Sequence, residues 1–322
     1  MMRLAILTSG GDSPGTNAAI EAVVRHARQE GAEVLGIRHG FAGLAAGDLS
    51  PLTVSDVDGI GARGGTVLGT SRDRTVGEAE GRERIATTLR RERIDGLVLL
   101  GGDGSIRHGG RSLNDMGVAC VAIPCTIDND VPETDRSLGF DTACNRAIAL
   151  ADGIRDTAQA LPGRMFVLET LGGQTGHIAL AVAETVYADL VLLPEFPLDL
   201  DYGAARMAAA VASRGYALAV ASEGAGDVHA MTAYLAEAAG HRARLTTIGH
   251  AQRGGPPSYL DRRLAAEFGA LAVERLLAGE TGLMTACSGY HVHTVDLGWV
   301  AAGQKSPDAA AYRRLNGMEV AD

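Results

Sequence analysis

The sequence is poor in aromatic side chains and in cysteine, and it has neither a long apolar run nor a run of basic residues. Aromatic residues make up 4% of the 322 positions, against 46% apolar and 21% charged residues, which is typical of a globular chain and excludes a disordered one. The four cysteines form neither a CxxC pair nor a zinc-binding pattern, so they predict a protein of a reducing compartment, the cytoplasm. No segment approaches the ~20 apolar residues of a membrane span, and the apolar stretch 4–7 is too short for the core of a signal peptide. We therefore expect neither membrane insertion nor export.

Positive charge is also in short supply. The chain has 29 basic and 39 acidic residues, a net charge of −10, and its basic residues form no run. A polyanion would be repelled by such a chain, so the composition excludes a general nucleic-acid-binding surface. If the protein binds small anions, we expect it to concentrate its positive charge in the binding cleft.

Apolar segments of strand type alternate with longer helical patterns along the whole chain. The length exceeds the usual 100–200 residues of one domain and favours two lobes or one large α/β unit. The continuous apolar run 97–100 is typical of a strand covered on both faces, as in a parallel sheet between helices. Strands are expected at 4–7, 34–37, 96–100, 118–123, 165–168, 190–193, 217–221 and 245–248, and helices at 16–29, 81–93, 106–116, 140–160, 176–187, 203–214, 229–239 and 258–278. The predicted fold class is α/β, with two Rossmann-like lobes whose parallel-rich sheets are covered by helices.

Glycine is the residue type in excess, at 43 positions, roughly double the usual share of ~7%. The Gly-Gly pairs are about as common as random placement gives, so only their positions are informative. Three of them, 10–11, 101–102 and 172–173, directly follow predicted strands, and ligands of α/β folds bind outside the carboxyl ends of strands. Glycine lets a phosphate approach the backbone N–H groups at the start of the next helix. The first loop has neither the lysine of a Walker A motif nor a GxGxxG pattern, which argues against a dinucleotide-binding dehydrogenase.

Carboxylates follow two of the predicted strands. Asp103 is flanked by glycines and is suited either to Mg²⁺ or to capping the helix that starts near Ser105. Asp128 and Asp130 come just after the strand 118–123, and alternation places their side chains on one side of the loop. Such a pair is suited to general-base work and to electrostatic control of a metal-bound phosphate.

Several cationic side chains are candidates for binding a phosphorylated substrate. Arg253 and His250 lie in the loop 249–255, which follows a predicted strand and carries no acidic residue. Guanidinium and imidazole groups both donate hydrogen bonds to phosphate. The other candidates are Arg72, Arg164 and Arg244.

Six segments together resemble the bacterial, ATP-dependent 6-phosphofructokinase family. They are GGDSPGTNAAI (10–20), RGGTVLGTSR (63–72), GGDGS (101–105), PCTIDNDV (124–131), GFDTA (139–143) and GHAQRGG (249–255). The resemblance covers roughly residues 3 to 295. It implies a homotetramer of two-lobed subunits that uses MgATP to phosphorylate the 1-hydroxyl of fructose 6-phosphate in glycolysis. It also implies a larger, nucleotide-binding lobe over 1–138 with a return segment near 252–305, and a smaller sugar-phosphate-binding lobe over 139–251.

The resemblance also implies a role for each candidate. Asp128 would be the general base, supported by Thr126 and Asp130. Asp103 would hold magnesium, and the nucleotide phosphates would lie against Gly11, Arg72, Gly102, Gly104 and Ser105. The sugar phosphate would be bound by Thr126, Asp128, Leu171, Gly172, Glu223, His250 and Arg253, with Arg164 and Arg244 lent by a neighbouring subunit.

Departures from the family pattern leave two alternatives. Gly104 favours ATP, because an Asp commonly stands there in pyrophosphate-dependent relatives, but Cys125 replaces the usual Gly or Lys near the phosphoryl donor. Leu171 and Gly173 replace the usual Met and Arg of the sugar site. The chain could therefore be a pyrophosphate-dependent kinase or a kinase of another anionic ketose, or else a catalytically weak member that senses sugar phosphate.

Overall fold

The computed structural model describes residues 1–319, which form two compact units. Unit 1 comprises Met1–Thr142 and Arg253–Lys305, and unit 2 comprises Ala143–Gln252 and the chain from Ser306 onward. The polypeptide therefore passes from one unit to the other three times. Within residues 1–319, no helix combines the length and the apolar character needed to cross a membrane.

Unit 1 is built on a sheet whose central strands are parallel. The strand order is β12-β11-β5-β4-β1-β2-β3, with the short β6 beside β5, and only the edge pairs β2–β3 and β11–β12 are antiparallel. Every residue of β4 is buried, as its continuous apolar sequence predicted. The strands are β1 (Arg3–Ser9), β2 (Glu33–Ile37), β3 (Leu49–Leu52), β4 (Gly96–Gly101), β5 (Cys120–Thr126), β6 (Leu138–Gly139), β11 (Leu283–Ser288) and β12 (His291–Asp296).

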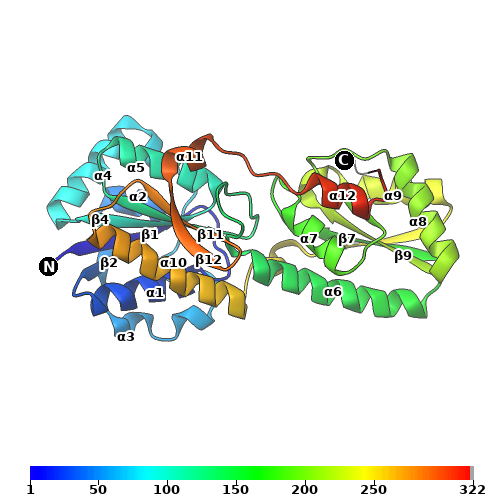
Figure 1. The fold of residues 1–322 in the computed structure, drawn as a ribbon, viewed down its shortest axis with the longest axis horizontal. Coiled ribbons are helices and arrows are strands. Elements are labelled where there is room, and N and C mark those ends of the chain that lie inside the picture. Colours follow the sequence, from blue (N-terminus) through cyan, green and yellow to red (C-terminus); the bar gives the residue numbers. More distant parts are fainter. Residues whose placement is uncertain (320–322) are drawn as a thin grey trace. The chain divides into compact units, whose positions relative to one another are not determined.

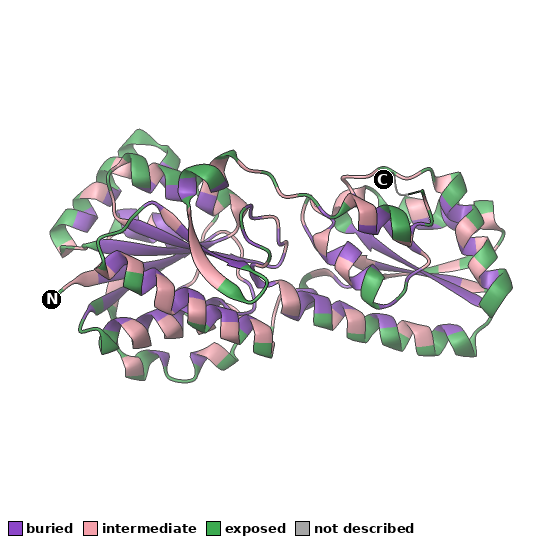
Figure 2. Ribbon diagram, in the orientation of Figure 1, coloured by how far each residue is buried: buried purple, intermediate pink, exposed green. Residues whose placement is uncertain are grey.

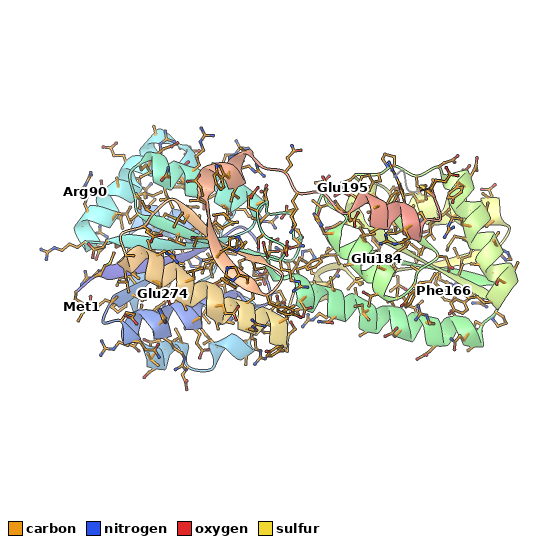
Figure 3. The ribbon with its side chains drawn as sticks, in the orientation of Figure 1. Met1, Arg90, Phe166, Glu184, Glu195 and Glu274 are labelled. Carbon is orange, nitrogen blue, oxygen red and sulfur yellow. The ribbon has the colours of Figure 1, made fainter. Side chains whose placement is uncertain are left out.

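Helices cover both faces of this sheet (Figure 1). In β1, Leu4 and Ile6 join one apolar cluster and Ala5 and Leu7 the other, because side chains alternate along a strand. The buried strands and the outward, exposed faces of the helices are distinct in Figure 2, and Arg90 and Glu274 mark such outward faces in Figure 3. The first cluster includes side chains of α1 (Thr16–Gln29) and α10 (Tyr259–Leu277), and the second those of α2 (Gly40–Ala46), α4 (Ala79–Glu92), α5 (Arg111–Asp115) and α11 (Leu297–Ala302). A short α3 (Val54–Val57) completes the α-helices of the unit.

Unit 2 contains a smaller, wholly parallel sheet in the order β10-β7-β9-β8. Alternate residues of β7 and β9 pack against α8 and α9 in one apolar cluster. The strands are β7 (Arg164–Thr170), β8 (Leu190–Leu192), β9 (Tyr216–Ser222) and β10 (Arg242–Thr247), and the helices are α6 (Phe140–Ala160), α7 (His177–Thr185), α8 (Leu200–Arg214), α9 (Val228–Ala239) and α12 (Ala309–Leu315). The α/β fold class is confirmed in both units.

Two elements differ from their predicted form. The helix expected at 106–116 begins as a π-helix, Ser105–Gly110, and continues as α5. A side chain at Gly109, within this irregular turn, would collide with the Phe41 ring, at 2.7 Å. The strand expected at 118–123 continues through Pro124 to Thr126, where its side opposite β4 has no partner at Pro124. A proline is tolerated at such an open position of a strand.

Asp261 anchors the point at which the chain first leaves unit 1. Its carboxylate is 1% exposed and accepts hydrogen bonds from Gly139 N (2.9 Å), Thr142 N (2.9 Å) and Thr142 Oγ1 (2.5 Å). All three groups act as donors toward its two oxygens. A buried carboxylate therefore fixes the start of α6 to α10.

We expect Asp261→Asn to destabilise the protein, because the amide nitrogen would face a backbone N–H and leave it unsatisfied. The expected loss is about 1–3 kcal/mol, measured as a lower melting temperature in thermal denaturation. Glu267→Gln is the matched control, because Glu267 lies on the same helix and makes only a half-exposed ion pair with Arg263, worth ~0–1 kcal/mol. Equal melting temperatures for the two variants would contradict the anchoring role.

Candidate active site

A cavity of about 940 Å³ opens in unit 1 at the carboxyl ends of β1, β4 and β5. This is the edge of a parallel sheet at which α/β folds bind ligands. Ten of the residues predicted from the sequence line it: Gly11, Arg72, Gly102, Asp103, Gly104, Ser105, Thr126, Asp128, Asp130 and Arg253. The structure thus brings the two glycine loops and the carboxylate loop together.

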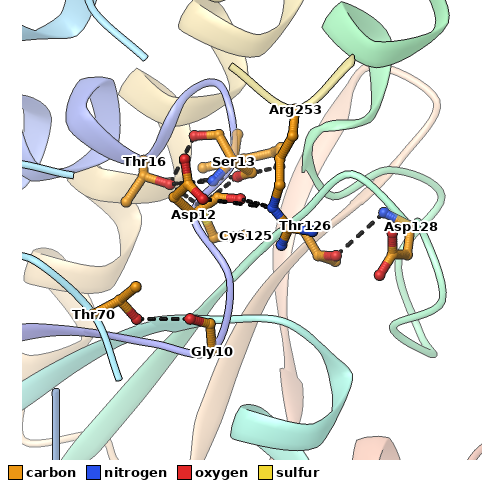
Figure 4. Close-up of polar contacts among 10 residues, drawn as sticks. Gly10, Asp12, Ser13, Thr16, Thr70, Cys125, Thr126, Asp128 and Arg253 are labelled. Atoms are coloured by element: carbon orange, nitrogen blue, oxygen red, sulfur yellow. Dashed lines mark hydrogen bonds and ion pairs between the residues drawn. The ribbon is translucent and has the colours of Figure 1, made fainter. Parts of the chain in front are cut away.

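The first glycine loop, residues 10–15, joins β1 to α1. Gly10 N donates to Ser71 O (3.0 Å) and Thr70 Oγ1 donates to Gly10 O (2.8 Å), so the loop is tied to the segment that precedes Arg72 (Figure 4). Gly15 has a φ of 103°, a left-handed value that favours glycine. The loop therefore has a fixed path between the strand and the helix N-terminus.

Arg253 lies directly against this loop. Its Nε donates to Asp12 O (2.8 Å) and lies 3.5 Å from Asp12 Oδ1. A Cβ placed on Gly11 would be 1.7 Å from Arg253 Nη2, so any side chain at this position would displace the guanidinium. The loop 249–255 carries no acidic residue, but the fold brings Asp12, 241 residues away in sequence, alongside Arg253.

The second glycine loop positions Asp103 in the cavity but not as the cap of the next helix. Instead, the two carboxylate oxygens of Asp103 accept hydrogen bonds from Arg107, at 2.7 Å from Nη2 and 3.2 Å from Nε. We did not predict Arg107, although a cation four residues after an acid on a helix is a recognisable pairing signal. Gly104 has φ −59° and ψ −40°, and a Cβ there would meet nothing within 4 Å.

The carboxylate loop follows β5. The Asp128 backbone N–H donates to Thr126 Oγ1 (3.2 Å). Asn129, between the two aspartates, is buried with a left-handed φ of 56°. Its side chain donates to Asp135 O (3.1 Å) and accepts from Ser137 N (2.9 Å). Asn129 therefore turns into the protein and holds the loop, while Asp128 and Asp130 line the cavity as the alternation predicted.

Asp130 lies where its ionised form is disfavoured. Its Oδ1 is buried and has no hydrogen-bond partner among residues 1–319. Burial, followed by the nearby charges of Asp128 and Asp103, raises the pKa of Asp130 to about 6. Asp130 is thus close enough to Asp128 and Asp103 for their charges to disfavour its ionised form.

The charge of the cavity differs from expectation. Its lining includes five arginines and six carboxylates, so positive charge is not concentrated there. The arginines are Arg72, Arg74, Arg82, Arg111 and Arg253, and the acids are Asp73, Glu78, Asp103, Asp115, Asp128 and Asp130. Asp103, Asp128 and Asp130 form an acidic group at the strand ends, an arrangement suited to a cation that accompanies an anionic ligand.

Cys125 is packed behind the first glycine loop. It is 2% exposed, and its Sγ lies 3.1 Å from both Ser13 Oγ and Thr16 Oγ1 (Figure 4). Burial raises the pKa of the thiol to about 11. Cys125 is therefore an unreactive structural residue of the loop and not a nucleophile.

The remaining predicted residues lie in unit 2 and divide into two groups. At the carboxyl ends of its strands, Glu223 Oε1 accepts from Gly172 N (3.1 Å) and Gly173 N (2.8 Å), and Leu171 N donates to Gln252 Oε1 (2.8 Å). His250 belongs to the short 3₁₀ turn Gly249–Gln252.

Arg164 and Arg244 lie elsewhere in the same sheet. Arg164 is the first residue of β7, and Arg244 on the neighbouring β10 is in register with Phe166. At ~3.3 Å per residue, the start of β7 lies roughly 20 Å from Leu171. One copy of unit 2 therefore does not gather Arg164 with Leu171, Gly172 and Glu223.

Comparison with known proteins agrees with this geometry. The family model described as "Phosphofructokinase" matches residues 3–276. A protein of Thermotoga neapolitana named ATP-dependent 6-phosphofructokinase is 39% identical over 97% of this chain and 98% of its own length. A protein of Bacillus cereus with the same name is 44% identical over 88% of each chain.

Solved structures show the same fold. Phosphofructokinase from Pichia pastoris superposes with a TM-score of 0.89 at 30% identity, over 94% of this chain, which spans only 35% of that longer polypeptide. A pyrophosphate-dependent phosphofructokinase from Marinobacter aquaeolei superposes with a TM-score of 0.86 at 24% identity, over 98% of this chain and 91% of its own. By the family model and by relatives aligned along most of their length, this chain belongs to the phosphofructokinase family.

Proposed function

We propose that this chain is an ATP-dependent 6-phosphofructokinase of glycolysis. It transfers the γ-phosphoryl group of ATP to the 1-hydroxyl of fructose 6-phosphate and yields fructose 1,6-bisphosphate and ADP. The observation that carries the proposal is the meeting, in one cavity, of two glycine loops with Asp103 and Asp128. The relatives named for this activity support the choice of donor and acceptor. We place the enzyme in the cytoplasm, where its four free cysteines would stay reduced.

Asp128 acts as the general base in this proposal. Phosphoryl transfer depends on positioning and charge neutralisation, and the protein needs only to orient the hydroxyl and accept its proton. The O1–P bond forms as the bond between the γ-phosphorus and the oxygen bridging to the β-phosphate breaks, and ADP leaves. The sugar O1–H bond breaks as well, and its proton passes to a carboxylate oxygen of Asp128. Thr126 and Arg253 border the same cavity, and Arg72 faces the transferred phosphoryl group.

The site fits Mg²⁺ that arrives with the nucleotide. Nowhere in residues 1–319 do three His, Cys, Asp or Glu side chains form a metal-binding group. Mg²⁺ commonly takes one or two carboxylates together with phosphate oxygens, and Asp103 would supply a carboxylate here. The unpartnered Oδ1 of Asp130 leaves negative charge that a nearby cation would offset. When bound, Mg²⁺ would neutralise charge on the transferring phosphoryl group.

Gly104 supports ATP as the donor. The open space around its α-carbon leaves room in the cavity beside the second glycine loop. Cys125, which left donor choice open on sequence grounds, is buried behind the first loop and adds no charge to the cavity.

The acceptor site is completed by a second subunit in this proposal. Glu223 is bonded to the backbone of Gly172 and Gly173, whereas Arg164 lies at the other end of β7. We therefore assign Arg164 and Arg244 to the sugar-phosphate site of a neighbouring subunit in a homotetramer. Leu171 and Gly173 stand where the family usually has Met and Arg, so the sugar site has one arginine side chain fewer. A panel of phosphorylated ketoses would rank the acceptors.

Asp128→Asn should abolish turnover while the KM for fructose 6-phosphate stays within about threefold, because the amide keeps the shape but cannot accept the proton. Loss of a general base typically lowers kcat by ~10²–10⁴-fold. Asp156→Asn, an exposed change on α6, is the control and should match the parent enzyme in a coupled assay. Unchanged kcat for Asp128→Asn would refute the role of the base.

Gly104→Asp should fold normally but lose use of ATP, with kcat/KM for ATP lowered by at least ~10-fold, since a charged side chain would face the nucleotide phosphates. Gly104→Ala is the matched control and should stay close to the parent, because its Cβ meets no atom within 4 Å. Steady-state kinetics with ATP and with pyrophosphate measure both. ATP kinetics that are unaffected by the aspartate would place the donor elsewhere.

Asp130→Asn should stabilise the protein above pH 6 while lowering kcat. The pKa of Asp130 in the folded chain, about 6, exceeds its ordinary value of 3.8, so the ionised form is disfavoured by folding. The contribution of Asp130 to the free energy of unfolding is therefore most favourable below pH 3.8. This contribution is lost as the pH rises through 6. The gain from the variant should be larger at pH 8, at about 1–3 kcal/mol, than at pH 5, as measured by denaturant unfolding. A loss of stability at pH 8 would contradict the repulsion among the carboxylates.

A further inference from the structure

The segment 301–305 comprises the end of α11 and the chain that leads to the last passage into unit 2. It touches both carboxylate-bearing loops of the cavity. Arg107 bridges it to Asp103. Its Nη1 donates to Ala301 O (2.6 Å) and Gly303 O (3.0 Å), while Nε and Nη2 donate to the Asp103 carboxylate. All three guanidinium nitrogens are engaged, and the planar fork fixes the carboxylate in two directions.

The same segment rests on the carboxylate loop. A Cβ on Gly303 would be 2.8 Å from Pro132 Cβ, so the backbone of the segment packs closely against the loop. Two residues on, Lys305 Nζ donates to Asp135 O (3.1 Å). Asp135 O also accepts from the side chain of Asn129, which lies between Asp128 and Asp130.

Lys305 is unusual in this chain. It is the single lysine among 29 basic residues, and it lies where burial lowers the pKa of its ammonium to about 8, although Asp135 and Asp130 partly offset this. With arginine at 28 other positions, a site that tolerated either cation would be expected to carry arginine. A compact ammonium on a flexible stem can donate to a single carbonyl oxygen, whereas a planar guanidinium presents a broad fork of donors.

We infer that Arg107 and Lys305 are positioning residues that clamp the segment 301–305 onto the loops of Asp103 and Asp128. The inference rests on the proposed function, because it assigns the clamp to the carboxylates of phosphoryl transfer. Arg107 holds the orientation of Asp103, and Lys305 holds the loop that carries Asp128. Neither residue lines the cavity, so each acts through another residue.

The clamp lies at the third passage between the units. Lys305 is the last residue of unit 1, and Ser306 begins the final segment of unit 2. That segment is fixed within unit 2, where Asn316 bonds to both backbone groups of Val191 and Tyr312 OH donates to Phe196 O. The segment is therefore tethered at both ends.

The first test measures metal binding without turnover, using Mn²⁺ in the presence of ADP and the electron paramagnetic resonance signal of free Mn²⁺. Loss of a residue that orients a metal ligand typically weakens affinity or activity by ~10–100-fold. We expect the Mn²⁺ dissociation constant of Arg107→Met to rise by that factor. Arg107→Lys keeps the positive charge but cannot donate two parallel hydrogen bonds, so its dissociation constant should lie between those of the parent and Arg107→Met. Arg90→Met, on the outward face of α4 (Figure 3), should remain within twofold of the parent.

The second test measures the loop itself by amide hydrogen exchange. Lys305→Met should speed exchange in residues 127–136 by at least ~10-fold and leave residues 10–20 unchanged, and Lys305→Arg should not restore protection. Mn²⁺ affinity within twofold of the parent in Arg107→Met, or unchanged exchange in Lys305→Met, would overturn the clamp. A fall in kcat without either change would also overturn it. Both readouts are independent of turnover, so failure of the clamp is distinguishable from failure of the proposed reaction, which Asp128→Asn tests.

Discussion

The candidate active site of unit 1 depends on one electrostatic constraint: three carboxylates, Asp103, Asp128 and Asp130, line the same cavity. Parallel strands deliver all three carboxylates to one edge of a sheet, where burial and neighbouring charge raise the pKa of Asp130. Such a group is stable only when cations and hydrogen bonds hold its loops in place. Arg107 binds Asp103 directly, and Asn129 and Lys305 hold the Asp128 loop through Asp135 O. The remaining charge is suited to a metal ion brought by the donor, and this explains why the cavity contains acids and arginines in similar number.

The three passages of the chain between the units have a structural feature in common. Each is fastened on the unit 1 side by a charged residue: Asp261 holds Gly139 and Thr142, Arg253 holds Asp12, and Lys305 holds Asp135. The second and third of these contacts involve loops that carry predicted site residues. Fixed loops matter for phosphoryl transfer, because its rate depends on the placement of reacting groups more than on covalent chemistry.

Local patterns predicted much of this architecture. Apolar residues at positions 20, 23, 24 and 27 are all buried in α1, and the continuous run in β4 is buried as predicted. Because parallel strands end together, loops far apart in sequence could be assigned to one site. Pairings that depend on the three-dimensional path could not be predicted: Asp12 with Arg253, and Asp135 with Lys305, are separated by 241 and 170 residues. The π-helix at Ser105–Gly110 could not be predicted either, because the apolar pattern at 106–116 does not distinguish it from an α-helix.

The proposed roles of Asp103 and Asp128 all depend on one reaction, the transfer of a phosphoryl group from ATP to the hydroxyl oxygen on carbon 1 of fructose 6-phosphate. The most direct measurement is a ¹³C and ³¹P NMR time course of the full-length protein with ATP, Mg²⁺ and fructose 6-phosphate labelled with ¹³C at carbon 1. We predict that a ¹³C–³¹P coupling appears at carbon 1 and that one ADP forms for each sugar molecule converted. ADP formation without that coupling, or coupling that appears only when pyrophosphate replaces ATP, would contradict it.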